Sequence, residues 1–183
     1  MRMLFIFILS FIPNIIIAQI GTIPFSIGDF EVDILQYSHM ILVENPVSYH
    51  LDTHYTFTNN EANYQVRYTL FRQTNKDDPN IKIPFTIMIT PIIWNIAGRQ
   101  VANIRNFDDI EVQLAFNGTF GSTILIDNPT SDFGAGYNYI LLNFFYKNNQ
   151  GFIVQSILSN DRNFFTFQNS IFSDIFHSFR FRN

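Results

Sequence analysis

The sequence predicts an all-β fold, an antiparallel, Greek-key-like β-sandwich with a short C-terminal helix. Apolar and polar residues alternate with a period of two over several short segments, and turn-forming residues separate these segments at fairly regular spacing. The apolar residues from Ile171 to Phe179 instead follow helical spacing, which predicts the closing helix. A small up-and-down β-barrel is the alternative fold, because such barrels show the same alternation.

Residues 1–18 have the features of a secretory signal peptide. Arg2 supplies a positive charge, an apolar run follows, and Ala18 is the small residue needed at a cleavage site. Pro13 interrupts the run, which lacks the ~20 clean apolar residues of a membrane span. An uncleaved membrane anchor is the alternative. We therefore expect an extracytoplasmic protein (periplasmic, surface-bound or secreted) whose mature part, residues 19–183, is a single β-rich domain.

The composition excludes several classes of function. There is no cysteine, so disulfides, thiol catalysis, thiol-bound metals, iron–sulfur clusters and a lipid-modified N-terminal cysteine are excluded. The net charge is −4 and the basic residues are scattered singly, so nucleic acid is not an expected partner. Only 14% of residues are charged, against ~25% in soluble domains, whereas 22 are phenylalanine. We expect these aromatic side chains to fill a β core or to face an apolar partner.

The clearest local prediction is a hairpin of two strands, Tyr49–Phe57 and Tyr64–Leu70, joined by the polar loop 59–63. One face of the hairpin is aromatic and aliphatic, and the other is polar. The residues predicted to be buried are Tyr55, Phe57, Tyr64, Val66 and Tyr68, and those predicted to be exposed are His50, His54 and Arg67.

Further strands are predicted along the rest of the chain: Phe30–Ile34, His39–Val43, Ile81–Ile89, Ile110–Phe116, Ser122–Ile126, Tyr137–Tyr146, Phe152–Leu158 and Asn163–Phe167. Tyr137–Tyr146 is apolar on both faces, as in a central strand, and residues 147–151 turn it into the next strand. Asn169 or Ser170 is expected to cap the C-terminal helix. A terminal strand is the alternative to this helix.

His50, Asp52 and His54 form the one cluster with the residue types of a metal site. On a strand, side chains two and four residues apart are separated by ~6.6 and ~13 Å, so one ion could reach only two of the three. A zinc site needs three or four ligands at ~2 Å. We therefore expect a polar hairpin face without a metal.

The acidic clusters are expected to be solvated. Asp77 and Asp78 are adjacent, as are Asp108 and Asp109, and neighbouring side chains of an extended chain point to opposite sides, so neither pair is a ready-made catalytic dyad. Glu111 extends the second cluster. The loop 127–132 lacks the spacing and the glycine of a helix-loop-helix calcium site.

No other motif assigns chemistry. The nucleophile-elbow, Walker and dinucleotide-binding patterns do not occur in the sequence. Trp94 is expected to anchor the core, because tryptophan is mostly buried. Asn117 heads an N-glycosylation triplet, which matters only in a eukaryotic source. We assign no catalytic residue, no cofactor and no metal ligand.

The function expected from these features is that of an exported, non-catalytic β-sandwich that binds a partner or builds a surface structure, as an adhesin-like or fibre-subunit module. Its expected partners are a protein or a carbohydrate at the cell surface, with self-association through sheet edges as a further option. A small outer-membrane β-barrel protein is the first alternative. A secreted hydrolase is the second, and it would need His50 or Asp52 to meet Asp108, Asp109 or Glu111.

Overall fold

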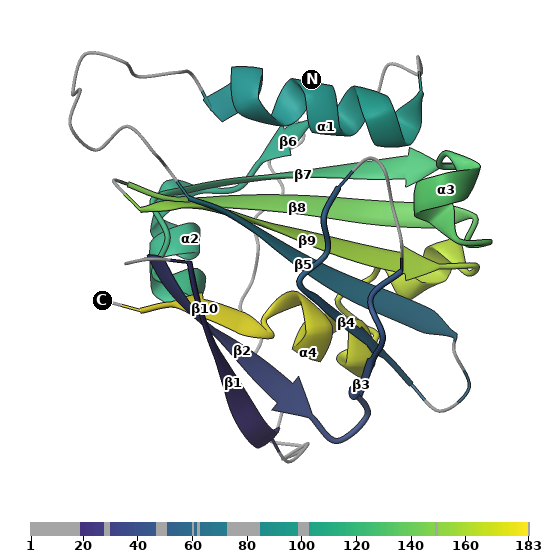
Figure 1. Cartoon of the computed structure of the whole chain (residues 1–183), viewed down its shortest axis with the longest axis horizontal. Helices are drawn as coiled ribbons and strands as arrows, with labels where there is room; N and C mark the ends of the chain where they lie inside the picture. Colours follow the sequence, from purple (N-terminus) through teal and green to yellow (C-terminus); the bar gives the residue numbers. More distant parts are fainter. Residues whose placement is uncertain are drawn as a thin grey trace.

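The computed structural model describes residues 19–27, 30–46, 51–59, 61, 63–72, 85–98, 103–148 and 150–182. The predicted signal peptide lies outside these residues, as do His50, Asp77 and Asp78. Two antiparallel sheets form the fold, one of three strands and one of seven (Figure 1). The larger sheet is open, with β3 and β6 at its two edges, so the predicted antiparallel fold is confirmed and the closed barrel is wrong.

The small sheet has the strand order β1 (Gln19–Ile27), β2 (Phe30–Tyr37), β10 (Phe179–Phe181). The large sheet has the order β3 (Ile41–Val43), β4 (Tyr55–Thr58), β5 (Tyr64–Arg72), β9 (Gly151–Ser159), β8 (Tyr139–Lys147), β7 (Phe120–Asp127), β6 (Arg105–Asn106). After β5 the chain crosses to the far edge and meanders back, so β9 lies between β5 and β8. This is a Greek-key-like connection.

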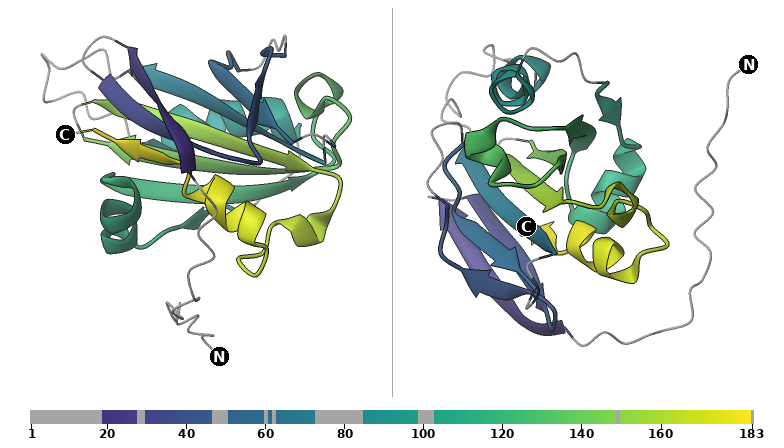
Figure 2. Two further views of the ribbon diagram at one scale, coloured as in Figure 1. Left: turned by 90° about the horizontal axis from the view of Figure 1, so that it is seen from below. Right: turned by 90° about the vertical axis from the view of Figure 1, so that its right-hand side faces the viewer.

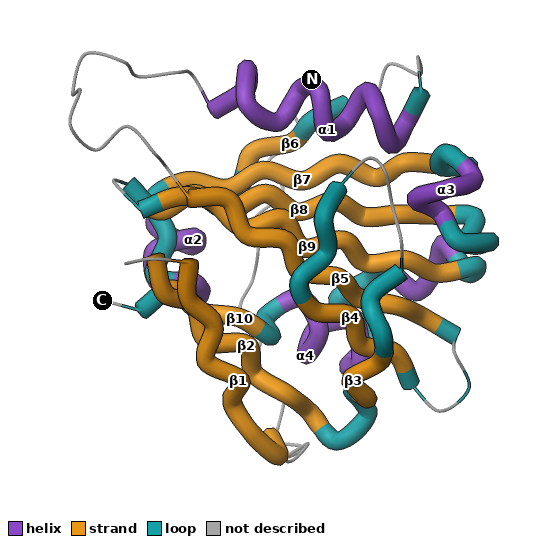
Figure 3. The backbone as a smooth tube through the Cα atoms, viewed as in Figure 1, coloured by secondary structure: helices purple, strands orange, loops and turns teal. Residues whose placement is uncertain are grey.

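The helices lie outside the sheets (Figure 3): α1 (Phe85–Ala97), α2 (Asp109–Phe116), α3 (Ser131–Gly134), the 3₁₀ turn η1 (Arg162–Phe164) and α4 (Ser170–Phe176). One core lies between the large sheet and the small sheet with α2 and α4. A second core lies between the opposite face of the large sheet and α1, with Phe133 of α3 and Leu51. Figure 2 shows α1 on one side of the large sheet and α4 on the other. The large sheet is therefore covered on both faces.

The predicted hairpin is confirmed as β4 and β5, but β4 begins only at Tyr55, so the predicted first strand is wrong over residues 51–54. The polar face of the hairpin is not exposed. Phe57 pairs with Val66 and both are fully buried. Tyr55 is half-buried. Arg67 is fully buried and His54 is half-buried, so their predicted exposure is wrong. Arg67 is covered by the second core, because this face of β5 packs beneath α3 and the segment that contains Leu51. The His54 ring is covered by Phe25 of β1, with ring centroids 5.1 Å apart.

The predicted strand Ile110–Phe116 is wrong, since these residues belong to α2. Asp108 caps the helix, its Oδ1 accepting hydrogen bonds from the N–H groups of Ile110 at 2.9 Å and Glu111 at 3.4 Å. Val112 and Phe116 lie four residues apart and enter the core. The same even-numbered apolar positions fit a strand and a helix, and the cap decides between them.

The predicted strand Ile81–Ile89 is also wrong over its described part, because Phe85 begins α1. Apolar residues occupy most positions of this segment, so both periods fit. Ile89, Ile93 and Ile96, spaced three and four residues apart, form the buried face. Trp94 lies on the opposite face and is 67% exposed, so the prediction that it anchors the core is wrong.

The strands predicted at Phe30–Ile34, Ser122–Ile126 and Phe152–Leu158 are confirmed within β2, β7 and β9. The strand predicted at Tyr137–Tyr146 is confirmed from Tyr139, where β8 begins. The strand predicted at Asn163–Phe167 is wrong. Asp161 Oδ1 accepts a hydrogen bond from the Asn163 N–H at 2.9 Å and bends the chain into η1. The C-terminal helix is confirmed as α4 with its Asn169 cap, and a strand, β10, follows it.

A buried polar network ties α4 to the large sheet. Thr123 Oγ1 donates to Asn143 Oδ1 at 2.6 Å, and Asn143 Nδ2 donates to Gln155 Oε1 at 3.0 Å. Gln155 Nε2 donates to the Ile175 carbonyl, near the end of α4, at 2.7 Å. Ser178 hydrogen-bonds both Tyr68 and this carbonyl. The network adds side-chain donors to the Ile175 carbonyl at the helix end, which also accepts a hydrogen bond from the Ser178 backbone N–H at 3.1 Å.

Candidate functional site

The candidate binding site lies where the large sheet is incomplete, at the outer side of β7. β6 pairs with β7 only through Arg105 with Thr123 and Asn106 with Ser122. Over Ile124–Asp127, no strand of the described residues lies on this side of β7. We call Ile124–Asp127 the open β7 edge.

The register decides which backbone groups the open β7 edge presents. The Phe107 N–H donates to the Gly121 carbonyl at 3.0 Å, so Gly121 turns its backbone groups away from β8. This orientation alternates along an antiparallel strand, so Leu125 and Asp127 also direct their N–H and C=O groups outward. An extended segment of a partner could hydrogen-bond these groups and lengthen the sheet.

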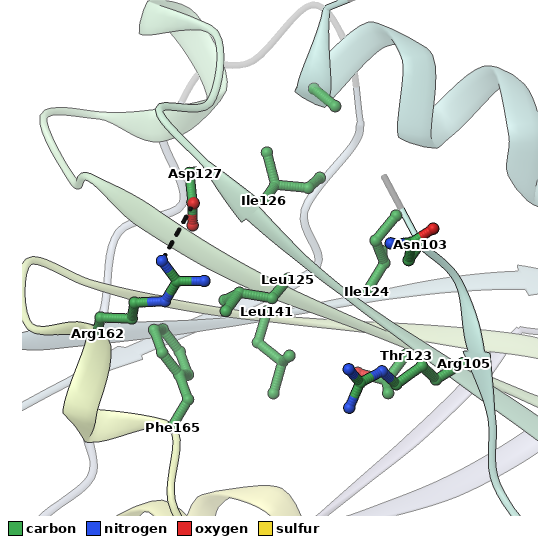
Figure 4. Close-up of a pocket in the computed structure, with 11 residues that line it drawn as sticks. Asn103, Arg105, Thr123, Ile124, Leu125, Ile126, Asp127, Leu141, Arg162 and Phe165 are labelled. Carbon is green, nitrogen blue, oxygen red and sulfur yellow. Dashed lines mark ion pairs between the residues drawn. The ribbon is translucent and has the colours of Figure 1, made fainter. Parts of the chain in front are cut away.

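A pocket of about 470 Å³ surrounds the open β7 edge (Figure 4). Its lining comes from both faces of the sheet and from the neighbouring chain: Ala97, Asn103, Arg105, Thr123, Ile124, Leu125, Ile126, Asp127, Leu141, Arg162 and Phe165. The middle of the pocket is apolar, with Leu125 and Leu141 at its centre. An added strand would therefore find apolar contacts beside its backbone hydrogen bonds.

Charged side chains lie at the two ends of the pocket. Arg162 Nη1 is 3.4 Å from Asp127 Oδ2 at one end, and the exposed Arg105 lies at the other. The Arg162 side chain is 61% exposed and that of Asp127 is 42% exposed, and ion pairs near the surface stabilise a fold by ~1 kcal/mol or less. The guanidinium of Arg162 is therefore accessible to an incoming carboxylate. The charged residues that line the pocket are two arginines and one aspartate, so their net charge is positive and favours a partner segment that carries acidic residues.

The titratable groups among the described lining residues are few. They include no histidine, and their one carboxylate is paired with Arg162. The hydroxyl of Thr123 donates to Asn143 and has no base beside it. The arrangement suits binding of an extended chain.

Of the residues predicted for a hydrolase, His50 lies outside the described residues, and no hydrogen bond or ion pair joins Asp52 to Asp108, Asp109 or Glu111 in the described part of the chain. The neighbouring His54 has a structural role. His54 lies against β5. Its backbone N–H donates to the Tyr68 carbonyl at 2.9 Å, and its imidazole Nδ1 accepts from the Leu70 backbone N–H at 3.3 Å. Burial lowers the pKa of His54, and the nearby Asp52 partly opposes this effect. Asp108, Asp109 and Glu111 instead form the start of α2, where carboxylates favour the helix dipole.

Arg67 is a feature that sequence reasoning missed. Its Nε donates to Gln65 Oε1 and its Nη1 to the Phe133 carbonyl, both at 2.7 Å, and its Cζ lies 4.9 Å from the centre of the Phe133 ring. Its Nη2 is buried without a hydrogen-bond partner among the described residues. Burial lowers the pKa of Arg67 to about 10, so the guanidinium stays charged at neutral pH. Arg67 thus attaches α3 to the sheet.

A second unpredicted group lies between the β2–β3 turn and α4. The ring of His39 stacks on Tyr37 with centroids 5.8 Å apart, and the Tyr64 hydroxyl donates to the His39 carbonyl at 2.8 Å. Burial lowers the pKa of His39 and raises that of Asp174, and the attraction between the two groups opposes both shifts. Sequence spacing could not find this pair, because the two residues come from opposite ends of the chain.

Asn117, the head of the N-glycosylation triplet, is half-buried and has a structural role. It ends α2 in the left-handed conformation (φ 56°), and its Nδ2 donates to the Phe181 carbonyl at 3.0 Å. In the part of the chain that the structure describes, no three His, Asp or Glu residues are grouped to hold a metal ion. No described helix is both long and apolar enough to cross a membrane.

Comparison with known proteins identifies a similar fold. The solution structure of a cyanobacterial PsbP (CyanoP) from Synechocystis sp. PCC 6803 matches with a TM-score of 0.55, over 90% of this chain and 96% of that one. Sequence identity is 13%, so the match shows a shared fold. No family model matches the chain, and neither does any curated protein sequence.

Proposed function

We propose that this chain is an exported, non-catalytic protein that binds an extended segment of a partner protein along the open β7 edge. The observation that carries the proposal is the outward direction of the Leu125 and Asp127 backbone groups, with no described strand to pair with them. The pocket around this edge supplies apolar contacts and two arginines. Export rests on the signal-like features of residues 1–18.

An adhesin-like or fibre-subunit role is the finer form of this proposal. In such assemblies a strand from a neighbouring subunit completes an open sheet. The β7 edge has the required backbone geometry. This role predicts that the added strand comes from a second copy of the chain or from another subunit of the same surface structure.

The test uses random peptides displayed on phage and selected against the intact purified protein. We expect the selected peptides to alternate apolar residues and to carry an acidic residue toward one end, and to shift the backbone amide resonances of Leu125 and Asp127 on binding. Leu125→Pro removes the outward donor but no hydrogen bond to β8, so it should fold and lose peptide binding. Arg105→Glu, at an exposed position, should weaken binding without affecting the fold.

Ile87→Asp, on α1 and outside the pocket, is the matched control and should bind these peptides normally. Peptides that bind the Leu125→Pro and Arg105→Glu variants as tightly as the natural protein, or that shift resonances elsewhere, would refute the proposal.

A further inference from the structure

Helix α1 forms the outermost layer on one side of the molecule, and its outer face is apolar. Its inner face, with Ile89, Ile93 and Ile96, is packed against the large sheet (Figures 1 and 2). On the outer face Ile87 is 60% exposed and Trp94 is 67% exposed. Pro91 lies between them and is exposed as well. We call Ile87, Pro91 and Trp94 the α1 stripe; their spacing of four and three residues aligns them along one side of a helix.

The surroundings of the α1 stripe differ from those of the other exposed apolar helix face. On α2 the exposed Ile110 and Leu114 are interleaved with Asp109, Glu111 and Gln113. Helix α1 contains no charged residue at all, and its outer polar positions are uncharged. Protein–protein interfaces typically have a polar rim around an apolar centre. The α1 helix itself offers no charged residues for such a rim.

The sequence on either side of α1 is basic. Residues 83–98 carry no charge, and the nearest charged residues on either side are Lys82 and Arg99. An apolar segment bounded by basic residues, with a tryptophan, is typical of helices that lie in the membrane interface. The charge pattern of the sequence around α1 therefore favours anionic lipid headgroups, in a chain whose overall charge is −4.

We propose that the α1 stripe inserts into the headgroup–acyl boundary of a lipid bilayer, with α1 lying parallel to the membrane surface. The helix has 13 residues, which gives a length of ~20 Å, enough to lie in the interface. The open β7 edge contributes side chains to the same core as α1. A membrane-bound α1 would therefore hold the open β7 edge within roughly one helix diameter, ~10 Å, of the headgroups.

The chain provides its own reporter for this proposal, because Trp94 is its only tryptophan. The probes are phosphatidylcholine vesicles, with or without a fraction of phosphatidylglycerol. We expect the Trp94 emission to shift to shorter wavelength on adding vesicles and to be quenched by lipids brominated on their acyl chains. Vesicles that contain phosphatidylglycerol should bind more protein, because Lys82 and Arg99 favour anionic headgroups.

Ile87→Asp should reduce vesicle binding by about tenfold or more, because an apolar contact is replaced by a charge at the lipid boundary. The exposure of Ile87 means that the variant should keep the circular dichroism and melting temperature of the natural protein. Ile110→Asp, at a similarly exposed position on α2, is the matched control and should bind vesicles normally.

Two results would overturn the proposal. The first is an unshifted Trp94 spectrum with no protein co-sedimenting with either type of vesicle. The second is a spectral shift without vesicles that grows with protein concentration, which would assign the α1 stripe to a contact between two copies of the chain. Peptide binding at the open β7 edge tests a different surface and can succeed or fail independently of both.

Discussion

Replacing Gln155 with methionine tests the buried network that joins the large sheet to α4. Gln155 is fully buried, accepts from Asn143 Nδ2 at 3.0 Å and donates to the Ile175 carbonyl at 2.7 Å. Methionine has similar length but makes neither bond. Two neutral hydrogen bonds contribute ~1 kcal/mol each, and the orphaned Asn143 amide adds ~1–3 kcal/mol. The greater apolarity of methionine offsets ~1 kcal/mol of this loss, so Gln155→Met should destabilise the protein by ~2–4 kcal/mol.

Urea unfolding followed by far-UV circular dichroism is the suitable assay. Tryptophan fluorescence would be insensitive, since Trp94 is 67% exposed and lies outside the network. Gln113→Met, at an exposed position on α2, is the matched control and should change the free energy of unfolding by less than ~0.5 kcal/mol. A second variant, Asn143→Leu, should be less destabilising when combined with Gln155→Met than the sum of the single changes, by ~1–2 kcal/mol, because the pair leaves fewer unpaired groups. A Gln155→Met variant as stable as the control would refute the network.

Three further predictions address the core, the histidines and the N-terminus. Phe57→Ala should cost ~3–5 kcal/mol in urea unfolding, since Phe57 is fully buried and packs edge-to-face on Tyr68 with centroids 6.0 Å apart; a cost below ~1 kcal/mol would contradict its placement. Burial lowers the pKa of both His39 and His54 below 6.5, so both favour the neutral form in the fold while the unfolded chain takes up protons. Stability should therefore be complete above pH 6.5 and fall as the pH drops through that value, and melting temperatures unchanged between neutral and mildly acidic pH would contradict this. N-terminal sequencing of protein from the extracytoplasmic fraction should begin at or near Gln19, whereas an intact Met1 on a membrane-bound form would show an uncleaved anchor.

Two kinds of strand were predictable from the sequence: those whose residues alternate between apolar and polar, and those that are apolar on both faces. Val66 and Tyr68 alternate with polar residues and mark β5, and the doubly apolar segment from Tyr139 marks β8, which is largely buried on both faces. The burial of Arg67 could not be predicted, because its partner is the carbonyl of Phe133, a backbone group with no sequence signature. Alternation identifies two faces of a strand but does not say whether a later segment covers the polar one.

Helices α1 and α2 were missed for a related reason, whereas α4 was predicted. In α2 the apolar residues at even positions satisfy a period of two, although only Val112 and Phe116 are buried while Ile110 and Leu114 are exposed. The capping carboxylate of Asp108 was the available signal. In α1 the dense apolar run gave no single period, and its exposed Trp94 contradicts the usual tendency of tryptophan to be buried.

An open sheet edge was expected from the sequence, as a place for self-association, but its position was not. That position depends on where the pairing between two strands stops. β6 is only two residues long, so β7 has no paired strand on this side beyond Thr123, which lies opposite Arg105. Neither Arg105 nor Arg162 stands in a motif, and the chain fold alone brings them to one pocket.

The placement of β9 and β10 has a consequence for how the chain folds. β5 acquires its neighbour on one side only when β9 has been made, and Ile34 of β2 pairs with Phe179, near the other end of the chain. Neither sheet can be completed by an N-terminal fragment, so contact order is high and folding should be slow, in the millisecond-to-second range of β-rich proteins. A polypeptide that emerges from a translocation channel N-terminus first would remain largely unfolded until its last residues arrive. If the chain is exported as proposed, slow closure of this kind would keep it unfolded during passage. Until the C-terminal strands are made, β2 has only β1 as a neighbour and β5 has only β4.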